Sequence, residues 1–313
     1  MLAILLPLTA CGNHKALANE TMGLNEANHM EYSKVESNIK RNLDVKDFHG
    51  ISNNLGVDIY FTQGSRFQVT AEATAENWNK CDIQVEDGIL KISRNKKHPR
   101  YQSMNFNGNI VLHVTAPNLD LLSNNGGMKF HADHWKAGNI KFRNNGAMTL
   151  SGNINQAASI TITNNGAISY KEGSIQGTNL SVSNNGASTI TVPIQLDGDF
   201  HISNNGSHKL ISDIQAASYI ETCNGSTNDQ ANIQADELKQ SINGSGKLDI
   251  HFKGKNADIA GSGSVNINMQ LDCDKLTVQS SGSAKIKIAG TADDTTIKND
   301  GTIKVDVTEL NKF

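Results

Sequence analysis

The sequence predicts an all-β protein, a single-stranded parallel β-helix of about ten coils of 19–20 residues with an N-terminal β cap. Three observations carry this prediction: a glycine-containing turn recurs at nearly constant spacing, apolar residues hold fixed positions around each glycine, and no unit has the length or 3.6-residue period of a helix. Chirality favours a right-handed coil.

The recurring turn is Asn-Asn-Gly in the first five units, and the later units keep its glycine. The spacing between these glycines is 20 residues four times and then 19 residues five times. Asn and Gly enter positive φ at the lowest cost, so the pair predicts a turn at one point of every unit. The repeat glycines are Gly126, Gly146, Gly166, Gly186, Gly206, Gly225, Gly244, Gly263, Gly282 and Gly301.

Apolar columns flank each turn. The fourth residue after the glycine is apolar in nine of ten units, and the fourth residue before it in eight of ten. Polar residues alternate with these columns, which predicts strands. Equivalent residues such as Leu150, Tyr170 and Ile190 should therefore stack one strand spacing apart, about 4.8 Å. A single coil cannot bury both its faces, so neighbouring coils must stabilise one another.

Three polar residues, Glu221, Asp229 and Gln240, interrupt these columns near the change from 20- to 19-residue units. A broken local rule can mark a functional site. The alternative is a bulge or a one-residue shift that turns the three side chains outward, and this is what we expect.

The asparagine before each glycine should form one file along the solenoid. Such a file could bind a ligand, or its amides could hydrogen-bond from coil to coil as in cross-β ladders. We expect the structural role, because the turn itself demands these residues. The predicted ladder comprises Asn125, Asn145, Asn165, Asn185, Asn205, Asn224 and Asn243 with Gly126, Gly146, Gly166, Gly186, Gly206, Gly225 and Gly244.

The N-terminus carries an apolar run followed by Leu8-Thr9-Ala10-Cys11, which resembles a bacterial lipobox. We expect residues 1–11 to contain a lipoprotein signal cleaved before Cys11, the lipid on Cys11 to attach the protein to a membrane, and Gly12 to favour the outer membrane. No Lys or Arg precedes the short run, so a coincidental apolar start is the alternative. Residues 12–41 are polar and predict a flexible tether.

Residues 42–118 contain alternating strand patterns without the strict period, including a hairpin at Asp87-Gly88. We expect this segment to cap the first coil, because an open β-helix end is an aggregation-prone edge. The β-helical repeats then occupy residues 119–313.

Four short stretches in this order carry a family resemblance. They are Phe48–Ile51, Val57–Gly64, Val85–Ile92 and Val114–Leu119, followed by the repeated glycine turns. Together they resemble the bacterial family described as "putative auto-transporter adhesin, head GIN domain", over roughly residues 40–310. The resemblance implies a secreted or lipid-anchored β-helical protein of the bacterial envelope and supplies no catalytic residues. This chain departs from the family in using Asn-Asn-Gly where Gly-Ser-Gly is commoner.

The cysteines and histidines form no recognised metal or redox motif. If Cys11 is lipidated, Cys81, Cys223 and Cys273 remain, which allows one disulfide and one free thiol. Cys223 and Cys273 are 50 residues apart, not a whole number of coils, so we do not expect them to stack. His131 and His134 lack the same-face spacing of a strand site, and we expect no metal and no cofactor.

Catalytic patterns are equally weak. Asp229, Asp236, Glu237 and Asp249 come nearest to a carboxylate group on a β-helix, but their spacing does not stack them in one column. We therefore expect no enzyme. The net charge of −3 and the lack of a basic stripe argue against a nucleic-acid partner.

These observations predict a non-enzymatic cell-envelope lipoprotein that presents its β-helix as a binding or adhesion surface, on the periplasmic or the outer side of the envelope. A polysaccharide or an envelope protein is the expected partner. The first alternative is a structural or assembly protein of the envelope, and the second is a polysaccharide-active enzyme.

Overall fold

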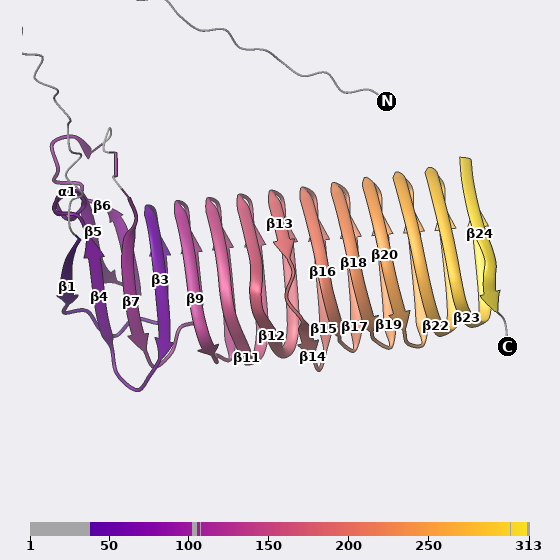
Figure 1. The fold of residues 1–313 in the computed structure, drawn as a ribbon, viewed down its shortest axis with the longest axis horizontal. Helices are drawn as coiled ribbons and strands as arrows, with labels where there is room; N and C mark the ends of the chain where they lie inside the picture. Colours follow the sequence, from indigo (N-terminus) through magenta and orange to yellow (C-terminus); the bar gives the residue numbers. More distant parts are fainter. Residues whose placement is uncertain (1–37, 102–104, 107, 301, 312–313) are drawn as a thin grey trace, which may run out of the picture. The chain divides into compact units, whose positions relative to one another are not determined.

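The computed structural model describes residues 38–311 apart from residues 102–104, 107 and 301 (Figure 1). Its one helix, α1 (Ala75–Lys80), is capped by the Thr74 side chain, and no helix in this described part is long and apolar enough to cross a membrane. The predicted lipidation site Cys11, residues 1–11 and nearly all of the predicted tether lie outside the described residues.

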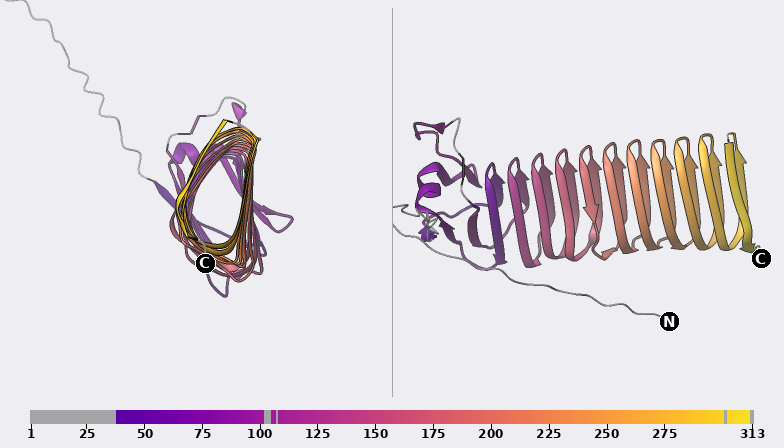
Figure 2. Two further views of the ribbon diagram at one scale, coloured as in Figure 1. Left: turned by 90° about the vertical axis from the view of Figure 1, so that its right-hand side faces the viewer. Right: turned by 45° about the horizontal axis from the view of Figure 1, so that its top comes forward.

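The described chain is a stack of parallel β coils (Figures 1 and 2). Its strands are β1 (Ile39–Leu43), β2 (Gly50–Asn53), β3 (Gly56–Gln63), β4 (Gln68–Ala73), β5 (Cys81–Glu86), β6 (Ile89–Arg94), β7 (Ile110–Ala116), β8 (Leu121–Asn124), β9 (Gly127–Trp135), β10 (Asn139–Asn144), β11 (Ala147–Asn164), β12 (Ala167–Asn184), β13 (Ala187–Ile190), β14 (Ile194–Leu196), β15 (Asp199–Asn204), β16 (Ser207–Gln215), β17 (Ser218–Cys223), β18 (Ser226–Gln234), β19 (Glu237–Ile242), β20 (Ser245–Lys253), β21 (Asn256–Gly261), β22 (Ser264–Ser280), β23 (Ser283–Asn299) and β24 (Thr302–Asn311).

The predicted β-helix is confirmed by the strand register. Leu150 of β11 pairs with Tyr170 of β12, which pairs with Ile190 of β13. All three side chains are buried, so they form the shared column that the repeat predicts. Viewed along the solenoid axis, the coils superimpose as one flattened ring around a core (Figure 2).

The stack begins before the first Asn-Asn-Gly turn. Strand β2 pairs in parallel with β8, which places Asn53 beside Asn124, and β3 pairs with β9, which places Ile59 beside Phe130. The chain then leaves this coil after β3 and returns at β8. The intervening segment supplies cap strands, among them the antiparallel pairs β4–β7 and β5–β6.

The repeat glycines are needed for close approach between coils. We predicted positive φ at the turns, but none of the described repeat glycines has it. A Cβ on Gly186 would instead lie 2.0 Å from the carbonyl oxygen of Gly166 in the preceding coil. The correction is that glycine is required here because stacked backbones leave no room for a side chain, whereas positive φ occurs at Asp87 and Gly88 in the cap hairpin.

Two rows of asparagine follow the turns, and sequence analysis considered only the outer one. In the outer, exposed row, Asn145 Nδ2 donates to Asn125 Oδ1 at 2.8 Å, and the same bond recurs through Asn243. The inner row is fully buried and runs in the opposite direction, with Asn124 Nδ2 donating to Asn144 Oδ1 at 2.9 Å. The inner row comprises Asn53, Asn124, Asn144, Asn164, Asn184 and Asn204.

Candidate binding groove

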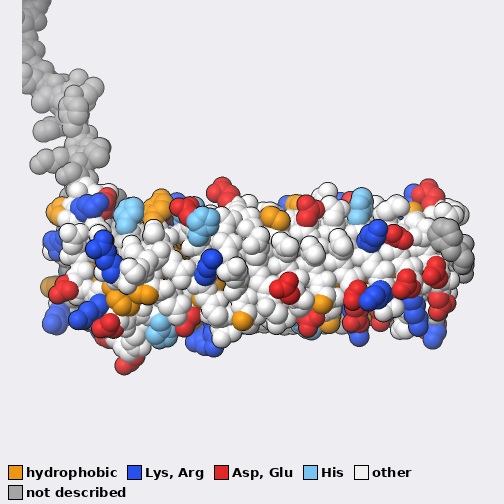
Figure 3. Space-filling view, turned by 90° about the horizontal axis from the view of Figure 1, so that it is seen from below, with side chains coloured by type: hydrophobic (Ala, Val, Ile, Leu, Met, Phe, Trp, Pro, Cys, Tyr) orange, Lys and Arg blue, Asp and Glu red, His pale blue; other side chains and the backbone are white. Residues whose placement is uncertain are grey.

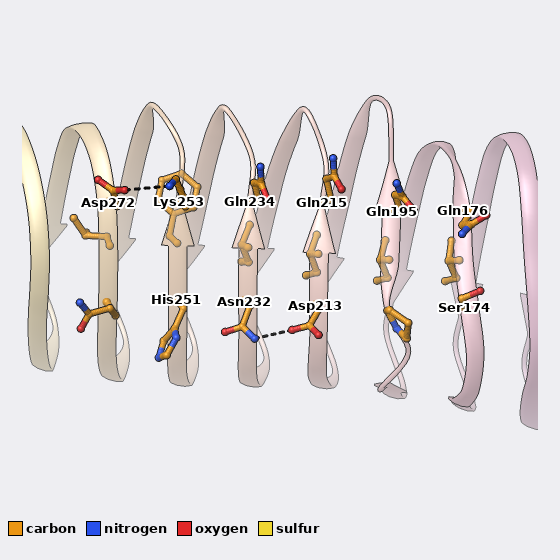
Figure 4. A pocket seen from close by; sticks show the side chains of 18 residues that line it. Ser174, Gln176, Gln195, Asp213, Gln215, Asn232, Gln234, His251, Lys253 and Asp272 are labelled. Carbon is orange, nitrogen blue, oxygen red and sulfur yellow. Dashed lines mark hydrogen bonds and ion pairs between the residues drawn. The ribbon is translucent and has the colours of Figure 1, made fainter.

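A groove of about 630 Å³ runs across successive coils between β12 and β22 (Figure 4). Its floor is a column of inward-pointing apolar residues that are almost completely buried, so the walls provide nearly all the accessible chemistry. The floor column comprises Ile175, Ile194, Ile214, Ile233, Phe252 and Leu271.

One wall of the groove is a row of four glutamines. Parallel pairing sets Gln176 beside Gln195, Gln195 beside Gln215, and Gln215 beside Gln234, so the side chains project from successive coils (Figure 4). All four are exposed. Within the described part of the chain no hydrogen bond reaches any of their amides, although neighbouring amides one strand spacing apart can form a ladder. The row therefore presents free donors and free acceptors to solvent.

The row changes character at its C-terminal end. Lys253 follows Gln234 in register, and its ammonium group lies 3.6 Å from Asp272 Oδ2 of the next coil. Both side chains are largely exposed, so this ion pair contributes little to stability. It makes the end of the groove charged, whereas the four preceding positions are neutral.

The opposite wall already uses some of its hydrogen-bonding groups, within the wall and with Asn153 of the preceding coil. Asn232 Nδ2 donates to Asp213 Oδ1 at 2.6 Å, and Ser174 Oγ donates to Asn153 Oδ1 at 2.9 Å. His251 stands next to Asn232 in register. This wall thus combines a fixed amide–carboxylate pair with an imidazole (Figure 4).

Two smaller hollows extend the same face. One, of about 330 Å³, shares Pro193, Asp213, Asn232 and His251 with the groove, and the other, of about 470 Å³, shares Gln215, Gln234, Lys253 and Asp272. The accessible surface is therefore a continuous trough and not a closed pocket, a shape that suits an extended ligand.

Sequence analysis missed the glutamine row, although the signal is visible. The four glutamines recur at intervals of 19, 20 and 19 residues, in step with the turns. Their position varies by one residue relative to the repeat glycine, because β11 and β12 pair through a register shift. A polar column of this kind is not found when only the apolar columns and the turns are compared between repeats.

The three polar residues expected to turn outward are buried in the core. Glu221, Asp229 and Gln240 are each no more than 1% exposed, so the predicted bulge or shift is wrong. Hydrogen bonds within the cluster hold them inside, and Asp229 Oδ2 and Gln240 Oε1 are left without a partner among the described residues. Glu221 accepts hydrogen bonds from the Tyr219 hydroxyl at 3.1 Å, from Gln240 Nε2 at 2.9 Å and from Thr227 Oγ1 at 2.9 Å.

Asp229 completes this cluster as a neutral acid. Burial, together with the neighbouring Glu221 carboxylate, raises the pKa of Asp229 well above its usual range. The Thr227 hydroxyl lies 3.0 Å from Asp229 and also bonds Glu221, but it has only one proton to donate. A protonated Asp229 resolves this conflict by donating to Thr227 Oγ1, which then donates to Glu221.

A buried histidine adjoins the cluster. His208 Nδ1 lies 2.5 Å from the Ser188 hydroxyl, and its Nε2 has no partner in the described part of the chain. Burial lowers the pKa of His208, while the Glu221 carboxylate opposes that shift. The imidazole is therefore kept neutral and acts as part of the packed core.

The residues weighed for enzymatic chemistry do not come together. Asp229 is buried in the core. Asp236 forms an ion pair with Lys255 at 3.0 Å, and Asp249 accepts a hydrogen bond from Asn268 at 2.8 Å. The carboxylates lining the groove, Asp213 and Asp272, are three coils apart, about 14 Å at one strand spacing per coil.

The structure also shows the state of the three described cysteines and the contacts of His131, which the sequence offered as a possible metal ligand. Cys81, Cys223 and Cys273 are buried free thiols, so no disulfide forms among them, and burial raises the pKa of Cys81 and of Cys273 to about 11. His131 bonds Asp133 and Ser151 at 2.8 and 2.9 Å. Within the described ranges no group of three or more His, Cys, Asp or Glu side chains is placed to hold a metal ion.

Comparison with protein families gives a match over most of the chain. The model described as "Putative auto-transporter adhesin, head GIN domain" matches residues 47–265 and 233–312. The chain belongs to this family. The resemblance inferred from the short stretches between Phe48 and Leu119 is thereby confirmed, and the matched ranges include both the head GIN cap strands and the coils that form the groove.

Several solved structures are similar to this head GIN chain. A putative adhesin from Bacteroides fragilis is 12% identical and covers 87% of this chain and 97% of its own, with a TM-score of 0.39. A "putative lipid binding protein" from Parabacteroides distasonis is 15% identical, with 86% and 96% coverage and a TM-score of 0.45. A putative adhesin from Parabacteroides merdae is 13% identical, with 86% and 96% coverage and a TM-score of 0.38. No curated protein matches the chain.

Proposed function

We propose that this head GIN protein is a non-enzymatic binding protein of the bacterial cell envelope and that its trough binds an extended, neutral polysaccharide. The observation that carries the proposal is the row of four exposed glutamines with unpaired amides on successive coils. Each amide offers two donors and an acceptor. A polymer of hydroxyl-bearing rings laid along the axis would meet such a group at every coil, about 4.8 Å apart.

The composition of the trough favours a glycan over a protein partner. Protein interfaces concentrate binding energy in buried aromatic and arginine anchors. Among the described residues, the exposed large hydrophobic side chains are Ile39, Tyr60, Tyr101 and Ile211, of which Ile211 alone lines the trough, in the hollow beside the groove, and it is neither aromatic nor arginine. The groove also has one cationic side chain, Lys253, which is paired, so a strongly acidic polymer would find little compensation.

A lipid ligand fits the described interior less well. The enclosed space within the core, beside Phe130, Trp135 and Tyr170, measures about 10 Å³, which is too small for an acyl chain. The floor of the groove exposes almost no apolar surface. The name of the Parabacteroides distasonis neighbour is therefore not extended to this chain.

We further propose that the lipid expected on Cys11 tethers the protein to the outer membrane, which would leave the β-helix free to reach its partner. The adhesin-like family supports a cell-envelope or surface location. Substitution of Cys11 by Ser should move the protein from the detergent-extracted membrane fraction to the soluble fraction. Equal amounts of wild type and variant in the membrane fraction would contradict the anchor.

The binding proposal is tested with soluble protein on an array of neutral, N-acetylated and uronic-acid oligosaccharides. The variant Gln215→Ala/Gln234→Ala removes the third and fourth amides of the row and should weaken binding of a neutral glycan about 10- to 100-fold, at about 1 kcal/mol per hydrogen bond. Gln279→Ala is the matched control, because this exposed glutamine of β22 lies outside the groove. If no glycan binds, the solenoid is better regarded as a structural spacer.

A further inference from the structure

The glutamine row continues one coil beyond the groove. Gln156 precedes Gln176 by 20 residues, in step with the spacings of 19, 20 and 19 residues that follow. A third hollow, of about 400 Å³, is lined by Gln156 together with Gln176 and Gln195, and the last two also line the groove. Gln156 is exposed, and no hydrogen bond reaches its amide among the described residues. The trough therefore extends toward the N-terminal end of the solenoid and carries a fifth unpaired amide there.

A β-bulge sets Gln156 in this row. The register of β11 and β12 shifts by one residue between Ile154 and Ala157. Two residues of β11, Asn155 and Gln156, therefore stand opposite Gln176 alone. Bulges bend a strand locally and are used next to functional sites to re-aim a side chain. Here the bulge brings a glutamine beside the first glutamine of the groove.

The backbone of Gln156 is left-handed, with a φ of +57°. Among the described residues from β8 to β24, the other positions with positive φ are all glycines: Gly152, Gly173 and Gly290. A residue with a Cβ pays a free-energy cost in this conformation that glycine avoids, because the Cβ crowds the following carbonyl oxygen. Glycine would therefore serve the bulge better, and folding alone does not account for a glutamine here. Residues held in such conformations cluster at ligand-binding sites.

The hollow beside Gln156 offers hydrogen-bonding groups that suit hydroxyls. Of the residues that line it, Asp197 alone is charged, and its carboxylate has no ion pair or hydrogen bond among the described residues. The amide can donate and accept, and the carboxylate can accept, so both can bind the hydroxyls of a neutral sugar. Charge is also sparse in the middle of the solenoid on the face shown in Figure 3, where charged side chains gather toward the two ends. The hollow thus continues the chemistry of the glutamine wall and provides no cation for an acidic polymer.

We propose that Gln156 is the terminal subsite of the trough, and that its strained backbone is retained because its amide binds one end of the polysaccharide. This inference rests on the proposed function, and it adds that the ligand contacts five successive coils. Gln156 and Gln234 are separated by four coil spacings, about 19 Å at about 4.8 Å each. Only a ligand of at least that length meets every amide, so the subsite favours long chains over short ones.

Two variants separate the amide from the strain. Gln156→Ala removes the amide but keeps a Cβ on the left-handed backbone, whereas Gln156→Gly removes both the amide and the strain. Oligosaccharides of two to twelve units of the best neutral hit on the array are titrated against each protein by calorimetry. Both variants should bind the longest members about fivefold more weakly than wild type, the loss of one hydrogen bond. The shortest members should bind unchanged, because they fit on the four remaining amides.

Stability supplies a readout that does not depend on the ligand. In urea denaturation, Gln156→Gly should have a higher midpoint than Gln156→Ala, since only the glycine relieves the strain. Asp87→Gly is the matched control, because Asp87 also has a positive φ, of +53°, but lies in the cap hairpin outside the trough. It should leave glycan binding unchanged at every length.

The outcomes separate the two proposals. If Gln215→Ala/Gln234→Ala weakens binding and Gln156→Ala has no effect at any length, the subsite is wrong and the trough stands. If Gln156→Ala weakens short and long members equally, Gln156 is not a terminal subsite. If Gln156→Gly is no more stable than Gln156→Ala, the bulge is not strained and the reason given for its glutamine is wrong. If the double variant changes nothing, or no glycan binds at all, the proposed function fails and the subsite fails with it.

Discussion

Of the three rows of side-chain amides along this solenoid, the buried asparagine row and the exposed glutamine row differ most in how their hydrogen bonds are used. Asn164, in the buried inner row, donates to Asn184 Oδ1 at 2.7 Å, to the Ala187 carbonyl at 2.8 Å and to the Gly166 carbonyl at 3.1 Å. Gln215, in the groove, has no partner in the described chain. The same functional group therefore stabilises the fold in one row and remains available to a ligand in the other.

The difference comes from reach and burial. An asparagine at the corner of a coil is short enough to meet carbonyl groups of its own turn and of the next coil, and burial makes each unmade bond costly. A glutamine on the flat, exposed face has water as an alternative partner and more rotamers to lose. Substitutions in and around the two rows should therefore change stability and binding separately.

The largest loss of stability is expected next to the inner row, at a repeat glycine. Gly186→Ala places a Cβ about 2.0 Å from the Gly166 carbonyl oxygen, so the two coils must separate. We expect the free energy of unfolding to fall by about 4 kcal/mol, measured by urea denaturation. Gly138→Ala is the control, since a Cβ there meets nothing within 4 Å. Equal, small effects at both positions would contradict the close-approach role.

The inner row itself should come next. Asn164→Ala removes the donor to Asn184 Oδ1 and the acceptor of Asn144 Nδ2, and both of these amides stay buried. We expect a loss of about 3 kcal/mol, because each unpaired buried group costs about 1–3 kcal/mol. The measurement is the urea midpoint of the variant against wild type. A loss below 1 kcal/mol would mean that the coils relax around the gap.

The sequence predicts the stacking of the coils well because each coil repeats the same pattern of turns and apolar residues. The 19- to 20-residue spacing and the apolar columns place Leu150 beside Tyr170 and Ile190, as found. It does not predict that Asn53 pairs with Asn124, because that contact spans 71 residues of inserted cap. Nor can a period of turns tell the buried asparagine of each pair from the exposed one.

The polar interruption of the core was not predictable for a different reason. Glu221, Asp229 and Gln240 each look misplaced alone, and only their mutual hydrogen bonds make burial tolerable. Such a cluster is recognised only from the three-dimensional structure, because its residues differ in type and lie on different coils. The glutamine row, by contrast, was within reach of the sequence, since its members repeat in step with the turns.

The buried cluster should give a pH-dependent effect of intermediate size. Because the pKa of Asp229 is raised in the folded protein, the folded state retains a proton that the unfolded chain releases above about pH 4. The stability of wild type relative to Asp229→Asn should therefore fall as pH rises from 4, by at most about 1.4 kcal/mol per pH unit.

The comparison of wild type with Asp229→Asn is best made by urea denaturation at pH 4, 5.5 and 7. His208 is common to both proteins, so its own titration cancels in the difference. Asp197→Asn, at an exposed carboxylate outside the cluster, should show no such trend. A difference that is constant with pH would mean that Asp229 is ionised in the fold.

The exposed outer row should contribute less than the buried one. Asn165→Ala removes the bond to Asn145 at 2.9 Å and the bond accepted from Asn185 at 2.9 Å. Water can replace both partners at this exposed turn, so we expect a loss of about 1 kcal/mol in the free energy of unfolding. A loss as large as that of Asn164→Ala would show that burial does not distinguish the two asparagine rows.

The smallest change in stability is expected in the groove, where the comparison is sharpest. Gln215→Ala/Gln234→Ala removes side chains that bond nothing in the described chain, and exposed substitutions of this kind stay within about 0.5 kcal/mol. The urea denaturation curve of the variant should therefore superimpose on that of wild type, while binding of a neutral glycan weakens about 10- to 100-fold. A destabilisation above 1 kcal/mol would mean that the glutamines form a ladder in solution. They would then be structural like the asparagines, and loss of binding in this variant would no longer identify a contact surface.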